Sequence, residues 1–166
     1  LEVGEEILLL LCLVEKTKLF IYQTLIDIPV LKRASMFGLF TGLRLSDLLQ
    51  LKWENIERSP DGGHCIRLCT EKTETEATLP ISEEALQYCG ERGDGLVFKG
   101  FKRSMAQHAF KNWVKSAGIT KKLSFHCLRH SFATILISLG IDVYVVSKML
   151  THRSVRTTQI YAEDRT

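Results

Sequence analysis

The stretch from residue 124 to residue 161 constrains the fold most, because apolar residues recur there at spacings of three and four. Such spacing predicts a helix with one face in the core. The apolar residues of that face are Phe125, Leu128, Phe132, Ile135, Leu136 and Leu139. Ser124 is a suitable N-cap and Gly140 suits the position after the C-cap, so both helix ends are indicated. His126 and Arg129 lie three residues apart and share one face of the helix.

The same stretch continues with two further predicted helices that bring reactive side chains. One helix is predicted from Val143 to Leu150 with Asp142 as its cap, and His152 follows just beyond its end. Ser154 is a suitable cap for the next helix, which carries Tyr161 near its end. Two histidines, an arginine and a tyrosine could therefore converge on one charged oxygen centre. Free backbone N–H groups at the start of the first helix favour an anion such as phosphate.

The rest of the chain predicts a mainly helical protein with a small antiparallel β-sheet, an α+β class. The 166 residues, 45% of them hydrophobic, suit a single globular domain spanning residues 1–166. Helices are predicted over residues 4–14, 31–40, 46–51, 85–89 and 104–117, and strands over residues 53–56, 65–69 and 77–81. Gly42 ends the second of these helices, Ser82 caps the fourth, and Gly118 closes the fifth.

Charge is distributed unevenly along the chain, although the net charge is only +3. No Asp or Glu occurs between Gly95 and Ile141, and the acidic residues concentrate before residue 95. The basic residues of this segment are Lys99, Lys102, Arg103, Lys111, Lys115, Lys121, Lys122 and Arg129. A segment of this kind is typical of a surface that contacts a polyanion, and equally of a solvated lysine face.

Cysteine usage and hydropathy indicate a cytoplasmic protein. The five cysteines are an odd number in a domain of ordinary size, which favours a reducing compartment over a disulfide framework. A zinc site built from His64, Cys65 and Cys69 is disfavoured because a strand would offer no nearby partner ligands. The apolar run over residues 7–14 is too short to span a bilayer, and its glutamate flanks do not fit a signal peptide.

Four motifs in order resemble one protein family. They are Thr41-Gly42-Leu43-Arg44-Leu45-Ser46-Asp47-Leu48, then Lys72-Thr73 followed by Leu79-Pro80-Ile81, then His126-x-x-Arg129-His130, and finally Leu150-Thr151-His152-Arg153-Ser154 with Thr157-Thr158 and Tyr161. In this order they are similar to the tyrosine recombinase (phage integrase) family. The resemblance implies that family's catalytic-domain fold and a site-specific DNA recombinase, most closely the integrase of a mobile genetic element.

The resemblance implies that Tyr161 attacks a DNA phosphorus and forms a 3′-phosphotyrosyl bond, while Arg44 and Arg129 hold the scissile phosphate. The chemistry suits these residue types. A guanidinium stays charged and binds phosphate oxygens with two parallel N–H groups, which stabilises the charge of a pentavalent transition state. Phenol has a pKa near ~10, so Tyr161 needs nearby positive charge to react as phenolate. The phosphotyrosine conserves bond energy, so neither ATP, a metal nor another cofactor is expected.

The remaining roles are also implied by the resemblance. His126 would assist proton transfer at the nucleophile, and His152 would hydrogen-bond a non-bridging phosphate oxygen. Lys72, on the predicted hairpin, would protonate the leaving 5′ oxygen as general acid. Asp47, three residues after Arg44, is a carboxylate placed to orient a catalytic side chain. His130 is interpreted as a core histidine that hydrogen-bonds backbone, outside the catalytic set.

The chain departs from the family pattern in three places. Thr151 stands where the family usually has glycine, and threonine is less tolerant of a left-handed backbone, which bears on the placement of His152. Glu163 stands where a second histidine often follows the nucleophile. An N-terminal DNA-binding domain and a C-terminal segment that docks on a neighbouring protomer are expected only in a longer protein. That full-length protein is expected to bind double-stranded DNA as a homo-oligomer, a tetramer, in the bacterial nucleoid.

Three other functions are weighed against the recombinase. A type IB topoisomerase uses similar tyrosine chemistry, but the motif contexts around Arg44 and His152 favour a recombinase. A metal hydrolase using His126, His130 and His152 would lack the glutamate base of an H-E-x-x-H helix, and Arg129 would repel its cation. A catalytically inactive DNA-binding module would not need the tyrosine.

Overall fold

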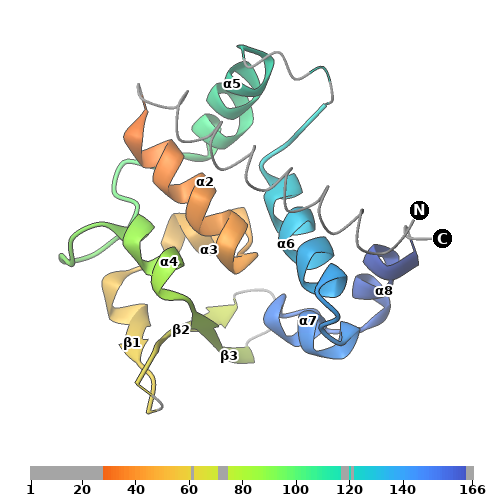
Figure 1. Ribbon diagram of the computed structural model, residues 1–166. Helices are drawn as coiled ribbons and strands as arrows, with labels where there is room; N and C mark the ends of the chain where they lie inside the picture. The colour runs from red at the N-terminus through yellow and green to blue at the C-terminus, as the bar shows by residue number, and fades with distance from the viewer. Residues whose placement is uncertain (1–27, 61, 71–74, 117–119, 121, 164–166) are drawn as a thin grey trace.

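The computed structural model describes residues 28–60, 62–70, 75–116, 120 and 122–163 (Figure 1). The helix predicted over residues 4–14, the closing Gly118 and the hairpin residue Lys72 lie outside the described residues. Within them the protein is mainly helical with a three-stranded antiparallel sheet, which confirms the predicted class. Figure 1 shows the sheet at the lower left of the molecule, α7 and α8 at the right, and α6 above α7.

Helix α2, Pro29–Thr41, is the central helix of the larger part of the core. Pro29 starts the helix, since its fixed φ suits the first turn and its missing N–H has no intrahelical partner there. Residues on almost every side of α2 are buried, as expected for a helix enclosed by neighbours. The helix ends at Gly42, which has φ 66° and donates its N–H to the carbonyl of Gly38 at 2.9 Å.

A short helix and the sheet follow α2. Helix α3, Leu45–Gln50, precedes a 3₁₀ turn η1, Trp53–Asn55, and strand β1, Ile56–Arg58. The predicted strand over residues 53–56 is therefore wrong except at its last residue, because the chain first turns through η1. Strands β2, His64–Thr70, and β3, Thr75–Ile81, complete the sheet in the order β1-β2-β3. Apolar residues of all three strands align, with Ile66 opposite both Ile56 and Leu79.

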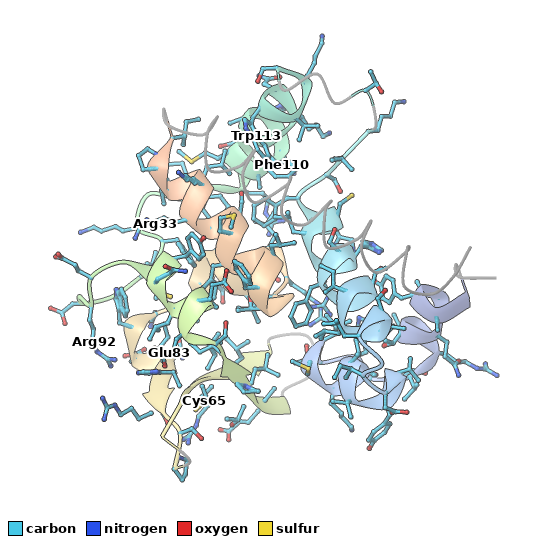
Figure 2. The ribbon with its side chains drawn as sticks, viewed as in Figure 1. Arg33, Cys65, Glu83, Arg92, Phe110 and Trp113 are labelled. Atoms are coloured by element: carbon cyan, nitrogen blue, oxygen red, sulfur yellow. The ribbon has the colours of Figure 1, made fainter. Side chains whose placement is uncertain are left out.

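The segment after the sheet forms short helices around a cluster of aromatic rings. Helix α4, Glu83–Leu86, is followed by the 3₁₀ turn η2, Gln87–Cys89, and Ser82 caps α4 as predicted by accepting a 3.1 Å bond from the N–H of Ala85. A π-helical turn η3, Met105–Ala109, leads into α5, Phe110–Ser116. The rings of Phe110 and Trp113 on α5 have centroids 5.2 Å apart (Figure 2).

Three helices complete the chain: α6, His126–Ser138, α7, Val143–Met149, and α8, Arg156–Glu163. Asp142 caps α7 as predicted, by accepting a 2.8 Å bond from the N–H of Tyr144. Helix α6 starts at His126, one residue later than predicted, and Phe125 is its N-cap in place of Ser124, without a side-chain capping bond. Leu139, predicted in the core, is 55% exposed, since α6 ends at Ser138 and Leu139 turns away from the buried face.

The core has two parts that meet along α6. The larger cluster lies among α2, α3, the sheet, α5 and the start of α6. The smaller cluster joins the later turns of α6 to α7 and α8, and consists of Phe132, Ala133, Ile137, Val146, Leu150 and Tyr161. Within the described ranges, no helix combines the length and apolar character needed to cross a bilayer.

Candidate active site

Arg129 lies in α6 between the two core clusters and is only 4% exposed. Its Nη1 donates to the carbonyl of Gly42 at 2.6 Å, and its Nη2 donates to the carbonyl of Leu150. These carbonyls belong to the C-terminal ends of α2 and α7, where backbone oxygens lack intrahelical partners and carry partial negative charge. The guanidinium is therefore held by two neutral acceptors on two other helices.

Arg44 reaches the same place from the start of α3. Its Nη1 donates to Thr151 Oγ1 at 2.7 Å and its Nη2 to the carbonyl of Thr151 at 3.4 Å, across 107 residues of sequence. Burial, and then the nearby charge of Arg44, lower the pKa of Arg129 to about 10, while Tyr161 and Asp47 act to raise it. Arg129 thus stays charged at neutral pH, and two like charges face one turn of the chain.

That turn follows α7 and has the hydrogen bonds of a Schellman motif. The N–H of Thr151 donates to the carbonyl of Lys148 at 2.9 Å, and the N–H of His152 donates to the carbonyl of Ser147 at 3.0 Å. The motif places Thr151 at φ 53°, the one positive φ outside glycine among the described residues. A β-branched residue in this conformation stores strain of about 1–3 kcal/mol. Threonine therefore occupies the left-handed backbone for which glycine is the usual residue.

His152 is held by α8. Its Nδ1 lies 2.8 Å from Oγ1 of Thr158, a side chain with no exposed surface. Burial first, and then the positive charges of Arg129, Arg44 and His126, lower the pKa of His152 to about 4. The imidazole is thus neutral at pH 7, with its ring plane set by Thr158. Sequence reasoning left Thr158 out of the site; its signal is the spacing of three residues before Tyr161, which puts both on one face of α8.

Tyr161 is 7% exposed and packs in the smaller core cluster. The ring of His130 lies edge-on against it, with centroids 5.1 Å apart, and His126 lies edge-on against His130 at 4.6 Å. Burial raises the pKa of the Tyr161 phenol, and the charge of Arg129 acts to lower it. The interpretation of His130 as a core histidine is wrong, because it is only half-buried, and its ring lies between those of His126 and Tyr161.

The other two histidines are also held neutral. Burial, then the charges of His130, Arg129 and Arg44, lower the pKa of His126, although part of its ring is exposed as the first residue of α6. Burial and the charge of Arg129 lower the pKa of His130. A neutral imidazole has one nitrogen able to accept a proton, so both rings can act as bases near the phenol.

The structure thus brings five of the predicted residues together and leaves two less defined. Arg44, Arg129, His126, His152 and Tyr161 interact with one another directly or through charge. The predicted carboxylate Asp47 is half-buried on α3, where its charge acts on Arg129, and the predicted general acid Lys72 lies outside the described residues. In the portion of the chain that the structure describes, no group of three or more His, Cys, Asp or Glu side chains is arranged to hold a metal ion.

Two other arginines contact backbone carbonyls elsewhere. Arg33 donates to the carbonyl of Cys89 at 2.8 Å, and Arg92 donates to the carbonyls of Trp53 and Ile56 at 3.4 Å. Figure 2 shows Arg33 and Arg92 on the side of the molecule away from α7 and α8. An arginine held by a carbonyl is therefore not in itself a catalytic feature here. The site is marked by two arginines at one turn beside three histidines and a tyrosine.

Comparison with known proteins identifies related sequences. Residues 20–166 match the phage integrase family. The tyrosine recombinase XerC of Myxococcus xanthus is 32% identical over 143 residues, covering 74% of this chain and 46% of that protein. The tyrosine recombinase XerD of Vibrio cholerae is 33% identical over 139 residues, covering 73% and 45%. The chain spans less than half the length of these curated relatives.

Solved structures show the same fold. The catalytic domain of bacteriophage HP1 integrase superposes with a TM-score of 0.70 at 24% identity, covering 87% of this chain and 81% of that one. The XerH site-specific recombinase bound to difH substrate gives a TM-score of 0.73 at 23% identity, covering 89% and 47%. The expected tyrosine recombinase catalytic-domain fold is confirmed. Since the family match also extends over most of the sequence, this chain belongs to the phage integrase family.

Proposed function

We propose that this chain is the catalytic part of a site-specific DNA recombinase that cleaves and rejoins duplex DNA through a 3′-phosphotyrosine at Tyr161. One observation carries the proposal. Arg44 and Arg129, 85 residues apart in sequence, are fixed at one turn by neutral acceptors, and Arg129 acts electrostatically on Tyr161. Paired guanidinium groups beside a phenol are suited to hold a phosphodiester for attack.

The two arginines would stabilise charge at phosphorus. The pentavalent transition state spreads negative charge over the non-bridging oxygens, and preorganised cations lower its energy most when they need not move. Hydroxyl and carbonyl acceptors hold Arg44 and Arg129 without cancelling their charge. His152, neutral and oriented by Thr158, would add one hydrogen bond to a non-bridging oxygen through its second nitrogen.

The proton of Tyr161 must leave as the new bond forms. The Tyr161 oxygen bonds to phosphorus, the bond to the 5′ oxygen breaks, and that oxygen takes up a proton. The phenol is protonated at rest, so a neutral imidazole must accept its proton, and His126 and His130 are both neutral. We assign the proton donor for the leaving oxygen to Lys72. A free 5′-hydroxyl then attacks the phosphotyrosine, which reverses the step and joins strands.

Double-stranded DNA is the proposed partner. The acid-free segment from residue 95 to residue 141 exposes a set of basic side chains that would bind backbone phosphates. They are Lys99, Lys102, Arg103, Lys111, Lys115 and Lys122. We further propose that the protein of which this domain is the catalytic part assembles as a tetramer on DNA, in the bacterial nucleoid, as the integrase of a mobile element. A topoisomerase would instead relax supercoils without joining strands between sites.

The test is a covalent complex on nicked duplex DNA, from which the cleaved strand end diffuses away and traps the adduct. We expect the full chain to form a tyrosyl adduct in the presence of a chelator, and Tyr161→Phe to bind the same DNA without forming it. Tyr144→Phe, on α7 and 54% exposed, is the matched control and should form the adduct. An adduct in Tyr161→Phe would identify another nucleophile, and DNA binding without any adduct would favour the inactive DNA-binding module.

A further inference from the structure

Thr151 lies in the turn after α7, and its side chain contacts Arg44 at the start of α3. We propose that Thr151 is a positioning residue, whose hydroxyl holds the guanidinium of Arg44 in the orientation that receives the scissile phosphate. The inference rests on the proposed function, since it assigns a role within the same site. Thr151 stands where the family usually has glycine, and a glycine there would have no side-chain acceptor for Arg44.

The contact fixes the plane of the guanidinium. Thr151 accepts from both terminal nitrogens of Arg44, at 2.7 Å through Oγ1 and at 3.4 Å through its carbonyl oxygen. Two bonds to one residue restrict rotation about the end of a long side chain that otherwise samples many rotamers. A guanidinium has five N–H donors, so two bonds to Thr151 are compatible with further bonds to phosphate oxygens.

Both acceptors of Thr151 are neutral, so they hold Arg44 in place without weakening its attraction for a phosphate. A carboxylate in the place of Thr151 would hold Arg44 equally well but would neutralise the charge that a phosphate needs. Arg44 and Arg129 also repel each other, as the effect of Arg44 on the pKa of Arg129 shows. Adjacent residues, Leu150 and Thr151, hold one arginine each. The turn therefore keeps two like charges together at the place where a phosphate would bind.

The backbone of the turn does not require threonine. At φ 53° glycine would be unstrained, whereas threonine is strained, and the Schellman bonds of the turn come from main-chain groups alone. The hydroxyl of Thr151 can thus be removed without removing the hydrogen bonds that form the turn. A glycine at this position relieves strain and removes the Oγ1 bond to Arg44, while the carbonyl bond remains. Valine keeps the shape and the strain but removes the same Oγ1 bond, and serine keeps a hydroxyl.

The experiment measures the single-turnover rate of adduct formation on nicked duplex DNA, together with the melting temperature, for the full chain and its variants. We expect Thr151→Val to slow adduct formation about tenfold or more, the range for a lost hydrogen bond to a charged group. Thr151→Ser should recover most of that rate. Thr151→Gly should melt at or above the temperature of the unmodified chain and still form adduct slowly.

A purely structural role makes the opposite prediction, because rate would then follow melting temperature and Thr151→Gly would be as active as the unmodified chain. Thr78→Val, an exposed threonine on β3, is the matched control for the threonine-to-valine change. In an Arg44→Ala background, Thr151→Val should cause no further loss, since the group it positions is absent.

The outcomes separate this inference from the proposed function. If the unmodified chain binds DNA and forms no adduct, the proposed function fails first. If it forms adduct and Thr151→Val does so at the same rate, only the positioning role is overturned. Faster adduct formation by Thr151→Val would also overturn it, because the hydroxyl would then be competing with the phosphate for Arg44.

Discussion

The imidazole of His130 lies edge-on against the phenol ring of Tyr161, with centroids 5.1 Å apart. The motif resemblance assigned the proton transfer at the nucleophile to His126, which contacts His130 rather than Tyr161 among the ring pairs of the described residues. The ring of His130, rather than that of His126, is therefore the histidine ring in contact with the Tyr161 ring. This arrangement leads to a prediction that distinguishes the two histidines.

His130→Phe keeps an aromatic ring against Tyr161 and removes the nitrogen that could accept a proton. We expect adduct formation to slow by about 10² or more, the usual contribution of a general base, with DNA affinity unchanged. His126→Phe is the matched comparison and should slow the reaction less. A normal rate in His130→Phe together with a large loss in His126→Phe would return the role to His126 alone.

Arg129→Lys tests the structural contacts of Arg129 and its proposed role at the phosphate together. Lysine keeps the charge but cannot replace both N–H bonds to the carbonyls of Gly42 and Leu150, and an unpaired buried acceptor costs about 1–3 kcal/mol. We expect the free energy of unfolding in urea to fall by about 2–4 kcal/mol and cleavage to fall by about 10²–10³. Arg33→Lys, which loses a comparable carbonyl contact away from the site, should lose stability but retain cleavage. Equal cleavage losses in the two variants would contradict the role of Arg129 at the phosphate.

Gly42→Ala tests the close approach of α2 to the smaller core cluster. Gly42 has φ 66°, and an added Cβ would lie 2.4 Å from Cδ1 of Phe132. Backbone strain and overpacking together predict a loss of about 2–4 kcal/mol in the free energy of unfolding. Gly140→Ala is the matched control, since Gly140 also follows a helix and has φ 82° but has nothing within 4 Å of an added Cβ. An equal loss in both variants would show that the close contact with Phe132 is unimportant.

Stability should depend on pH through His152. Its pKa is near 4 when folded, below the value of about 6.5 for an unfolded histidine. Between these values the unfolded chain binds more protons, so the free energy of unfolding falls as pH is lowered from about 6.5 towards 4. The free energy of unfolding of His152→Gln, measured in urea titrations, should fall less steeply over this pH window. Part of the slope should remain, because the pKa values of His126 and His130 are lowered as well. Parallel curves for the two proteins would show that His152 is not the group that titrates.

Lys72 is tested by changing the leaving group. If Lys72 protonates the departing 5′ oxygen, Lys72→Ala should cleave ordinary DNA slowly. It should cleave DNA with a bridging 5′ sulfur at nearly the normal rate, because a thiolate leaves without a proton. A lysine that only binds backbone phosphate would impair both substrates alike, with a defect that deepens as salt is added. Equal loss on both substrates would make His152 the next candidate.

The elements with local signals were predictable from the sequence. The apolar period of residues 31–40 and the caps Ser82 and Asp142 act over three or four residues, and the structure contains all three features. Helix ends that depend on a single residue were less predictable, since Phe125 takes the place expected for Ser124.

The contacts that assemble the site were not predictable in the same way. Motif spacing predicted a set of site residues, and the structure brings Arg44, Arg129 and Tyr161 of that set together. The motif spacing gave no indication that Arg44 binds Thr151, because a contact across 107 residues leaves no local pattern. The position of His130 depends in the same way on how α8 packs against α6, which only tertiary structure decides.

The carbonyl contacts of Arg129 also affect which residues would be retained if such a protein lost its activity through mutation. A descendant released from selection for cutting DNA would still need Arg129 to join α2, α6 and α7, so selection for folding alone would retain it. The phenolic oxygen of Tyr161 has no comparable structural role, since a phenylalanine ring would fill the same space in the core cluster. Across an alignment of descendants, a preserved arginine would therefore be poor evidence of a working enzyme, and the tyrosine would be the informative position.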